Sequence, residues 1–272
     1  MSKRSLSRTT KTLALCLMLV LLMISAAPVF AQRIDPRVYI PPHAYSLFPT
    51  FEQEDSKHAP SFVDTPYFLA LSEVESCVTL THSRCLRPDA QLKSSRELGV
   101  GLGQFTIAYR ADGSVRFDTF ANMRKQYPVL LKDFHESTIR QRTDLQVLAM
   151  VLLWRDGCKS LYHLPDKREL TAICDAAYNG GLRDILNTRR VCGLAANCDP
   201  NKWFGNLERM LQKSDVKIPM YGNKSPRDIN IHHVQEVMNV RMPKYIRAFE
   251  FQRSRSLRIG LKAPQNHEKQ PQ

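Results

Sequence analysis

The stretch TDLQVLAMVLLW, residues 143–154, decides the fold class, because Leu145 to Trp154 contains a single polar residue, Gln146. A segment that is apolar on every side predicts a helix buried in a core. Ten residues are too few to cross a membrane, which takes roughly 20. Thr143 and Gln146 stand three residues apart at its head, a spacing that predicts a capping box.

Residues typical of helix starts and helix ends stand on both sides of this stretch. Thr65 before Pro66 predicts an N-cap and a first helical residue, with a helix running to about Ser76. Asp166 with Glu169 predicts another helix start, and the double glycine at 180–181 predicts its end. Later helices are predicted from about Lys202 to Gln212 and from Asp228 to about Val240, with Pro243 breaking or restarting the chain. Strand-like alternation is scarce, so the chain is predicted to be mainly α.

The helix that begins at Pro66 carries two acidic residues with different expected surroundings. Phe68, Leu71 and Glu75 are spaced i, i+3, i+7 and share one face, whereas Glu73 is predicted to point into solvent. A carboxyl group among apolar side chains has a raised pKa, so Glu75 is a candidate general acid. On this spacing alone, a glutamate that is merely paired with a cation or caps a loop is the commoner outcome.

The N-terminal residues 1–31 have the features of a secretory signal peptide: four cations, an apolar run, and Ala-Pro-Val-Phe-Ala before the predicted cleavage site. An uncleaved anchor is the alternative. Cleavage removes four basic and no acidic residues, so the net charge falls from +13 to +9. A basic exported chain is attracted to anionic envelope polymers. Residues 32–61 are expected to form an extended lead-in, 62–255 the domain, and 256–272 a disordered tail.

Six cysteines remain after the signal peptide, an even number that predicts disulfides in an oxidising compartment. Short separations favour Cys77 with Cys85 and Cys192 with Cys198, which leaves Cys158 with Cys174. A zinc site is disfavoured, because there is no Cys-x-x-Cys pair and no histidine at ligand spacing beside these residues.

The glycine-rich stretch GVGLGQF, residues 99–105, predicts a sharp bend or a close approach to a ligand. It is neither a dinucleotide fingerprint, because residue 104 is Gln, nor a P-loop, because no Gly-Lys-Ser/Thr follows. The neighbouring pairs His232-His233 and His135-Glu136 are interpreted as surface or core residues, because residue 139 is Ile and the His-Glu-x-x-His pattern fails. No metal site and no cofactor is predicted.

Three segments follow one another along the chain in this order: Glu75-Ser76, Gly101-Leu102-Gly103-Gln104 and Ala177-Tyr178-Asn179-Gly180-Gly181. Together they resemble the soluble lytic transglycosylase family, which is related to goose-type lysozyme. The resemblance covers roughly Pro66 to Arg183 and implies a lysozyme-like α+β fold with a single helical catalytic domain and disulfide-stapled loops. It implies Glu75 as acid and base, oriented by Ser76. Gln104 would contact glycan, while Gly101 and Gly103 line the cleft. Tyr178 and Asn179 would form the opposite wall. In the family a late tyrosine also approaches the catalytic group, and Tyr245 in Pro-Lys-Tyr-Ile is the nearest match to it.

The resemblance implies cleavage of peptidoglycan glycan strands with 1,6-anhydro products, in the periplasm or after secretion. The span from Glu75 to Gln104 is longer than in short family members, which makes Glu97 a rival for the catalytic role. The nearest alternative is a hydrolytic muramidase that uses Asp89, Glu97 or Asp175 to activate water. A noncatalytic envelope-binding protein is a further alternative, and a partner in an envelope machine is left open. A nucleic-acid-binding role is disfavoured by the signal peptide and the lack of a basic helix.

Overall fold

The apolar stretch forms the core helix α5 (Thr143–Cys158), most of whose residues are buried. The computed structural model describes residues 34–94, 96–219 and 222–260. Helices dominate these residues and one small sheet accompanies them, so the predicted fold class, mainly α with some β, is confirmed. The described residues from Pro36 onward belong to one compact unit, and the predicted signal peptide lies outside the described residues.

The other helices and turns are η1 (Pro42–Leu47), α2 (Phe48–His58), α3 (Thr65–Ser76), α4 (Thr119–Gln126), η2 (Ile139–Gln141), η3 (Lys159–Leu161), α6 (Lys167–Gly180), α7 (Leu182–Gly193), η4 (Trp203–Leu207), α8 (Glu208–Met210), α9 (Pro226–Gln235), η6 (Glu236–Arg241) and α10 (Met242–Gly260). The strands are β1 (Gln91–Lys93), β2 (Glu97–Val100), β3 (Phe105–Tyr109) and β4 (Val115–Asp118).

The expected extended lead-in is helical from Pro42 onward. Phe48 and Phe51 of α2 are buried, and α2 packs against both α5 and α3. Phe48 stacks on Phe249 of α10 with ring centroids 4.7 Å apart. The apolar residues of α2 therefore belong to the core, and the expectation of an extended lead-in is wrong from Pro42 onward.

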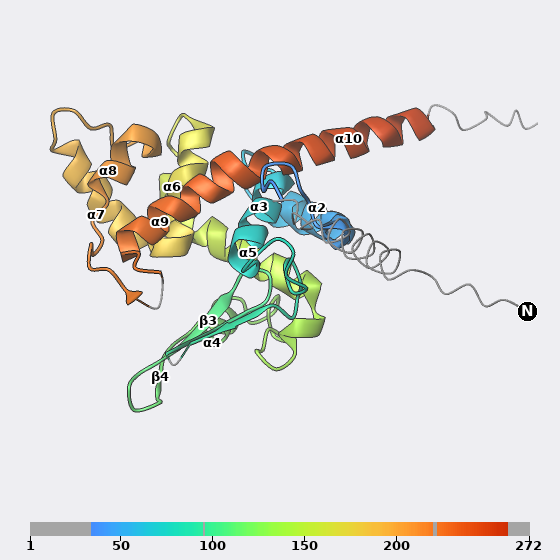
Figure 1. The fold of residues 1–272 in the computed structure, drawn as a ribbon, viewed down its shortest axis with the longest axis horizontal. Helices are drawn as coiled ribbons and strands as arrows, with labels where there is room; N and C mark the ends of the chain where they lie inside the picture. Colours follow the sequence, from blue (N-terminus) through green and yellow to red (C-terminus); the bar gives the residue numbers. More distant parts are fainter. Residues whose placement is uncertain (1–33, 95, 220–221, 261–272) are drawn as a thin grey trace, which may run out of the picture. The chain divides into compact units, whose positions relative to one another are not determined.

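The four strands in the described part of the chain form one antiparallel sheet in sequence order. Figure 1 shows β3 and β4 as a hairpin on the other side of α5 from α10. Each strand has only three to five residues, and β4 is largely exposed. Such short strands give little room for alternation, which explains why the sequence showed so little of it.

Gln146 holds the glycine turn between β2 and β3 instead of capping α5. Its Oε1 accepts a hydrogen bond from Leu102 N at 2.7 Å, while its Nε2 donates to the carbonyls of Pro88 and Ile139. The predicted capping box is wrong, because Arg142 is the N-cap residue and no side chain caps that end. Both donor hydrogens and the oxygen of this buried amide are engaged, so the one polar residue of the apolar run from Leu145 to Trp154 fixes the turn.

Some of the other helix ends agree with the prediction from the sequence, and others do not. Asp166 caps α6 by accepting from Arg168 N and Glu169 N, and Gly181 ends that helix with φ of 92°, both as predicted. The N-cap of α3 is Asp64 rather than Thr65, although Pro66 lies in its first turn as expected. The helix predicted from Lys202 is interrupted, because Gly205 has φ of 73°, and only α8 follows.

The C-terminal helices α9 and α10 are joined through η6 and run as one long element in Figure 1. Pro243 does not break this element. The wider π-helical turn of η6 directly precedes it, and such turns are a known way to accommodate a missing backbone N–H. The helix continues to Gly260, beyond the predicted tail boundary, and residues 261–272 lie outside the described residues. In the described part of the chain, no helix is long and apolar enough to cross a membrane.

The six described cysteines form the disulfides Cys77–Cys85, Cys158–Cys174 and Cys192–Cys198, as their separations predicted. The first closes the loop that follows α3. The second links the end of α5 to α6, and the third fastens the end of α7 to the loop behind it. Disulfides of this density suit an oxidising compartment.

Gly101 should tolerate a side chain less well than another glycine with the same backbone conformation. Gly101 and Gly113 have φ of 80° and 82°, so alanine at either costs about 1 kcal/mol of backbone strain. A Cβ at Gly101 would lie 2.3 Å from Gln146 Oε1, whereas one at Gly113 would meet nothing within 4 Å. Urea unfolding should show Gly101→Ala to be less stable than Gly113→Ala by roughly 1–3 kcal/mol. Equal losses would contradict the role given to Gln146.

Candidate active site

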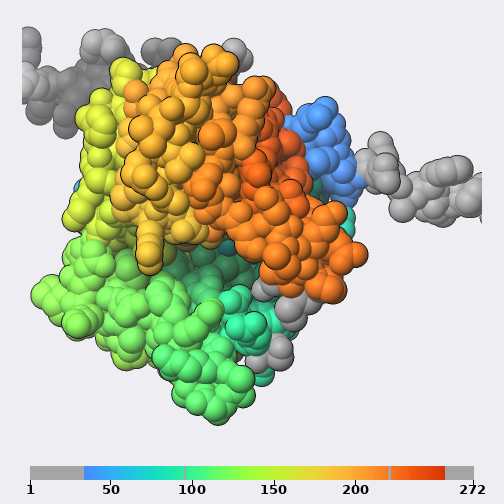
Figure 2. Space-filling view, turned by 90° about the vertical axis from the view of Figure 1, so that its left-hand side faces the viewer, coloured from blue at the N-terminus to red at the C-terminus, as the bar shows by residue number. Residues whose placement is uncertain are grey.

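A cleft of about 990 Å³ opens between the sheet and the end of α6. Figure 2 shows the surface recessed where the green segment meets the yellow and orange helices. Five of the residues predicted from the sequence line the cleft: Glu75, Gly103, Gln104, Tyr178 and Asn179. Three sequence segments that are far apart along the chain therefore meet at one site.

Glu75 lies in the last turn of α3, and its side chain is 16 % exposed. Its Oε1 lies 3.0 Å from Nε2 of His233, which belongs to α9. The sequence predicts only a surface or core position for this histidine. The separation of 158 residues explains the omission, because no local pattern links the two side chains.

His233 joins Glu75 to a second carboxylate. Its Nδ1 lies 2.9 Å from Oδ2 of Asp175, which is fully buried and also accepts a hydrogen bond of 2.7 Å from the Tyr67 hydroxyl. Burial by itself lowers the pKa of His233, but the charges and hydrogen bonds of Asp175 and Glu75 outweigh it and raise that pKa from 6.5 to about 10. The raised pKa favours the protonated form of His233, which is held between two carboxyl groups.

Tyr178 and Asn179 line the cleft from the end of α6. The Tyr178 hydroxyl donates to Gly103 O at 3.2 Å, and a Cβ at Gly103 would lie 2.9 Å from that hydroxyl. Burial, followed by the charges of Glu75 and Asp175, raises the pKa of Tyr178 well above its usual value, so it stays neutral. Asn179 accepts from Asn230 Nδ2 at 2.9 Å, which ties this part of the lining to α9.

Gln104 has an unusual backbone for its residue type, with φ of 45°. Its Nε2 donates to Gly101 O at 2.8 Å, and its Oε1 is buried and finds no hydrogen-bond partner among the described residues. A non-glycine residue in the left-handed region costs energy and persists where its surroundings hold it, often at functional sites.

Ser76 and Gly101 lie next to the cleft but do not line it, and their contacts hold the local backbone in place. The Ser76 hydroxyl donates to Ser72 O at 2.6 Å and accepts from Leu86 N at 3.1 Å, so it fastens the disulfide-closed loop to α3. Gly101 accommodates Gln146, as described above. The expected orientation of Glu75 by Ser76 is instead provided by His233.

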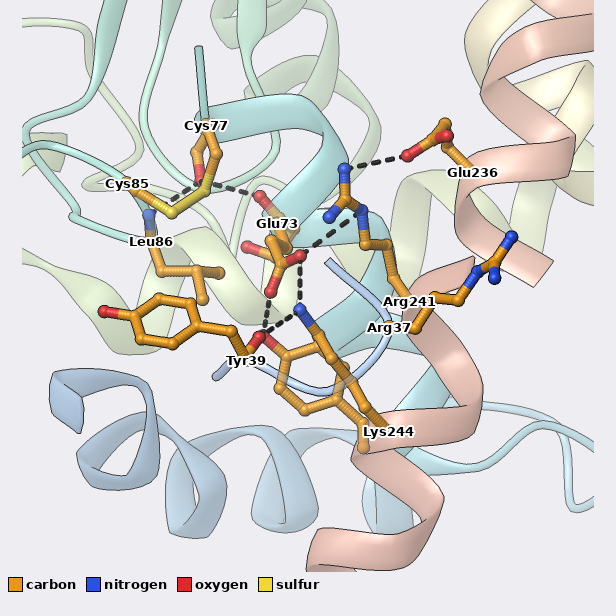
Figure 3. Close-up of polar contacts among 12 residues, drawn as sticks. Arg37, Tyr39, Glu73, Cys77, Cys85, Leu86, Glu236, Arg241 and Lys244 are labelled. Atoms are coloured by element: carbon orange, nitrogen blue, oxygen red, sulfur yellow. Dashed lines mark hydrogen bonds and ion pairs between the residues drawn. A yellow bond between two sulfur atoms is a disulfide. The ribbon is translucent and has the colours of Figure 1, made fainter. Parts of the chain in front are cut away.

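Glu73 is buried, so the prediction that it faces solvent is wrong. Its side chain accepts from Lys244 Nζ at 2.8 Å and from the Tyr245 hydroxyl at 2.6 Å, and Arg241 lies 3.4 Å away (Figure 3). Tyr245 was expected near the catalytic group, but its hydroxyl bonds to Glu73 and not to Glu75. Glu73 is enclosed because α3 packs between α2, η6 and α10.

The other candidate carboxylates differ in their access to the cleft. Glu97 lines it from β2 and lies 3.5 Å from Arg116. Asp89 pairs with Arg87 at 3.4 Å and is outside the lining, and Asp175 is enclosed by Tyr67 and His233. The acidic residues that line the cleft are therefore Glu75 and Glu97.

No model of a known protein family and no curated protein matches the chain. The functional argument therefore depends on the residues of the site. Among the described residues, no group of three or more His, Cys, Asp or Glu side chains could hold a metal ion. The cleft therefore presents a partly exposed carboxyl group with a buried histidine behind it, and its lining also contains amide and phenol groups.

Stability should fall in alkaline solution because of His233. A histidine whose pKa is raised on folding contributes stability that is complete below its unfolded pKa of about 6.5 and is lost as pH rises through about 10. The shift corresponds to roughly 3–5 kcal/mol. Urea unfolding between about pH 6 and pH 9.5 should show this loss in the native chain and a clearly smaller one in His233→Gln. Parallel pH curves for the two proteins would contradict the raised pKa.

Replacing Tyr245 tests whether it serves the fold or the cleft. Tyr245→Phe removes a donor to the buried Glu73 carboxylate, a hydrogen bond to a charged group worth about 1.5–3 kcal/mol. Urea unfolding should show that loss, while kcat for any reaction at the cleft stays within about twofold, because Glu75 has other partners. A large loss of kcat without a loss of stability would instead place Tyr245 in the active site.

Proposed function

We propose that this protein is a peptidoglycan lytic transglycosylase that cleaves the bond between N-acetylmuramic acid and N-acetylglucosamine, with Glu75 as acid and then base. The convergence of three family-like segments on one cleft around Glu75 carries this proposal. The segments matter together, because each alone is a common pattern.

The dimensions and polarity of the cleft favour a sugar polymer. Its volume of about 990 Å³ is at the upper end of the range for ligand sites, and the cleft is open to solvent. Phe117 and Leu92 offer apolar contact on the sheet side, while Gln104 and Asn179 offer amides. Lys93 and Lys213 also line it, which suits the negative charge of the cell wall.

The reaction needs one carboxyl group used twice. Protonated Glu75 gives its proton to the bridging oxygen, the bond from that oxygen to C1 of the muramic acid breaks, and the sugar's acetamido group stabilises the cation at C1. The Glu75 carboxylate then takes the proton of the 6-hydroxyl, and O6 bonds to C1. The product is a 1,6-anhydro ring, and Glu75 is protonated again.

Inverting hydrolysis is the alternative that one observation favours, because Glu97 lines the same cleft. In that reaction a second carboxylate activates water on the other face of the sugar. Asp175 is a poor candidate for this role, since both of its oxygens are engaged inside the protein. The product distinguishes the two reactions: a hydrolase leaves reducing ends.

The proposal extends to location and partners. An exported protein with three disulfides and a basic charge would act in the periplasm or outside the cell, on peptidoglycan strands. Genome neighbourhood would distinguish wall remodelling, assembly of an envelope machine and phage lysis as its setting.

The central test is digestion of purified sacculi by the native protein, Glu75→Gln and Glu97→Gln, with product analysis by mass spectrometry. We expect anhydro ends from the native protein and a loss of at least about a hundredfold in Glu75→Gln, because removal of the acid removes both steps. Glu97→Gln should keep activity within about tenfold.

The other results have definite meanings. Reducing ends, with loss of activity in Glu97→Gln, would replace the transglycosylase by the hydrolase. Full activity in Glu75→Gln would refute the assignment of Glu75. Sacculus binding without any cleavage by the native protein would favour the noncatalytic envelope-binding alternative.

A further inference from the structure

His233 and Asp175 are the least expected part of the site, because neither lines the cleft. They lie behind Glu75, and their side chains are 7 % and 0 % exposed. Three separate elements, α3, α6 and α9, contribute the trio of Glu75, Asp175 and His233. A buried cation between two carboxyl groups, one of which is partly exposed, needs an explanation beyond packing.

Each ring nitrogen of His233 has its own carboxyl partner. Asp175 occupies Nδ1 at 2.9 Å, and Tyr67 holds Asp175 in turn at 2.7 Å. A buried carboxylate on one ring nitrogen fixes the orientation of the imidazole and leaves the other nitrogen for a defined partner. That partner is Glu75 Oε1, at 3.0 Å.

We propose that His233, held by Asp175, is a positioning residue that remains protonated and stabilises the Glu75 carboxylate formed when the acid proton leaves. The inference rests on the proposed function and adds how Glu75 is controlled. Because Oε1 receives the Nε2–H of His233, Oε2 is the oxygen that carries the acid proton.

The proton count balances through the cycle. In the first step the Oε2–H bond of Glu75 breaks, its proton moves to the bridging oxygen, and the bond from that oxygen to C1 breaks. The negative charge that appears on Glu75 meets the Nε2–H of the imidazolium, a charge-assisted hydrogen bond. In the second step Oε2 takes the 6-hydroxyl proton. His233 keeps both of its protons throughout.

The groups around His233 support a lasting positive charge. Glu75 contacts it from α3 and Asp175 contacts it from α6. The Tyr67 hydroxyl donates to Asp175, and the charges of Glu75 and Asp175 act on Tyr178. Burial is the first cause that raises the pKa of both tyrosines well above the usual value, so they stay neutral. The exposed neighbour His232 lies on the same helix. The carboxylates therefore set the charge state of His233.

The decisive variant is Asp175→Asn, which keeps the shape and can still accept from Tyr67. Without the Asp175 charge, burial lowers the pKa of His233, so the imidazole becomes neutral at a lower pH. Activity on sacculi should then fall on the alkaline side: at about pH 8 kcat should be roughly 10- to 100-fold below the native value, and at about pH 5 within threefold. KM should change little.

Two further variants are compared with Asp175→Asn. His233→Gln should lose kcat by about 10- to 100-fold at every pH, because an uncharged amide cannot replace the imidazolium. His232→Gln, a change at the exposed neighbour, should match the native protein in kcat and pH profile. Circular dichroism and melting of each variant report whether it folds.

A second measurement tests the charge of His233 without any turnover. Histidine ring shifts of the native protein, assigned by comparison with His233→Gln, should show His233 protonated from about pH 5 to pH 9 and titrating lower in Asp175→Asn. A His233 that is neutral at pH 7 in the native protein would overturn the inference, even if Asp175→Asn did not fold.

The outcomes separate this inference from the proposed function. If the native protein cleaves sacculi and Glu75→Gln does not, but Asp175→Asn and His233→Gln keep the native kcat and pH profile, then only the inference fails. If the native protein does not cleave glycan, the proposed function fails, and the ring shifts still decide the charge of His233.

Discussion

Burial of α3 is the constraint on which the rest of the structure depends. A helix packed between α2, η6 and α10 has little surface in contact with solvent, yet α3 carries Glu73 and Glu75 in its last turn. A carboxylate removed from water is tolerated when cations and hydrogen bonds replace its hydration. The long C-terminal element supplies them to both groups: Lys244 and Tyr245 to Glu73, and His233 to Glu75.

The C-terminal element, formed by α9, η6 and α10, therefore both covers the core and supplies polar partners to α3. His233 precedes η6 and Lys244 follows it, so the π-helical turn lies between the partners of the two glutamates. A π turn shifts the register of the residues that follow it. The same turn precedes Pro243, whose ring an unbroken α-helix would accommodate poorly. One local irregularity thus joins α9 to α10 while each segment presents its polar side chains to α3.

The parts of this arrangement that sequence reasoning could predict are those encoded locally. The apolar run before Trp154, the cap at Asp166 and the stop at Gly181 each depend on a few neighbouring residues, and the structure has all three. The solvent-facing assignment of Glu73 failed because the buried face of a helix depends on what packs against it. His233 was missed for the same reason, since its partner is 158 residues away. The short strands are held largely by tertiary contacts, such as that of Gln146 with the glycine turn.

The two glutamates differ in the balance of charge around them, and this difference separates a structural site from a chemical one. Glu73 has Lys244 and Arg241 as cations and a tyrosine hydroxyl besides, and at 1 % exposure it is sealed from solvent. Such a carboxylate is enclosed by its partners and holds α3 against the C-terminal helices. In the other group, one imidazolium serves both Glu75 and Asp175. One histidine shared by two carboxyl groups is a smaller compensation than the two cations beside Glu73, and Glu75 is the member of the trio that lines the cleft. The proposed role as acid and base fits this arrangement, because a carboxyl group with one cationic partner and access to the cleft can reach a substrate, whereas Glu73 is enclosed by its partners.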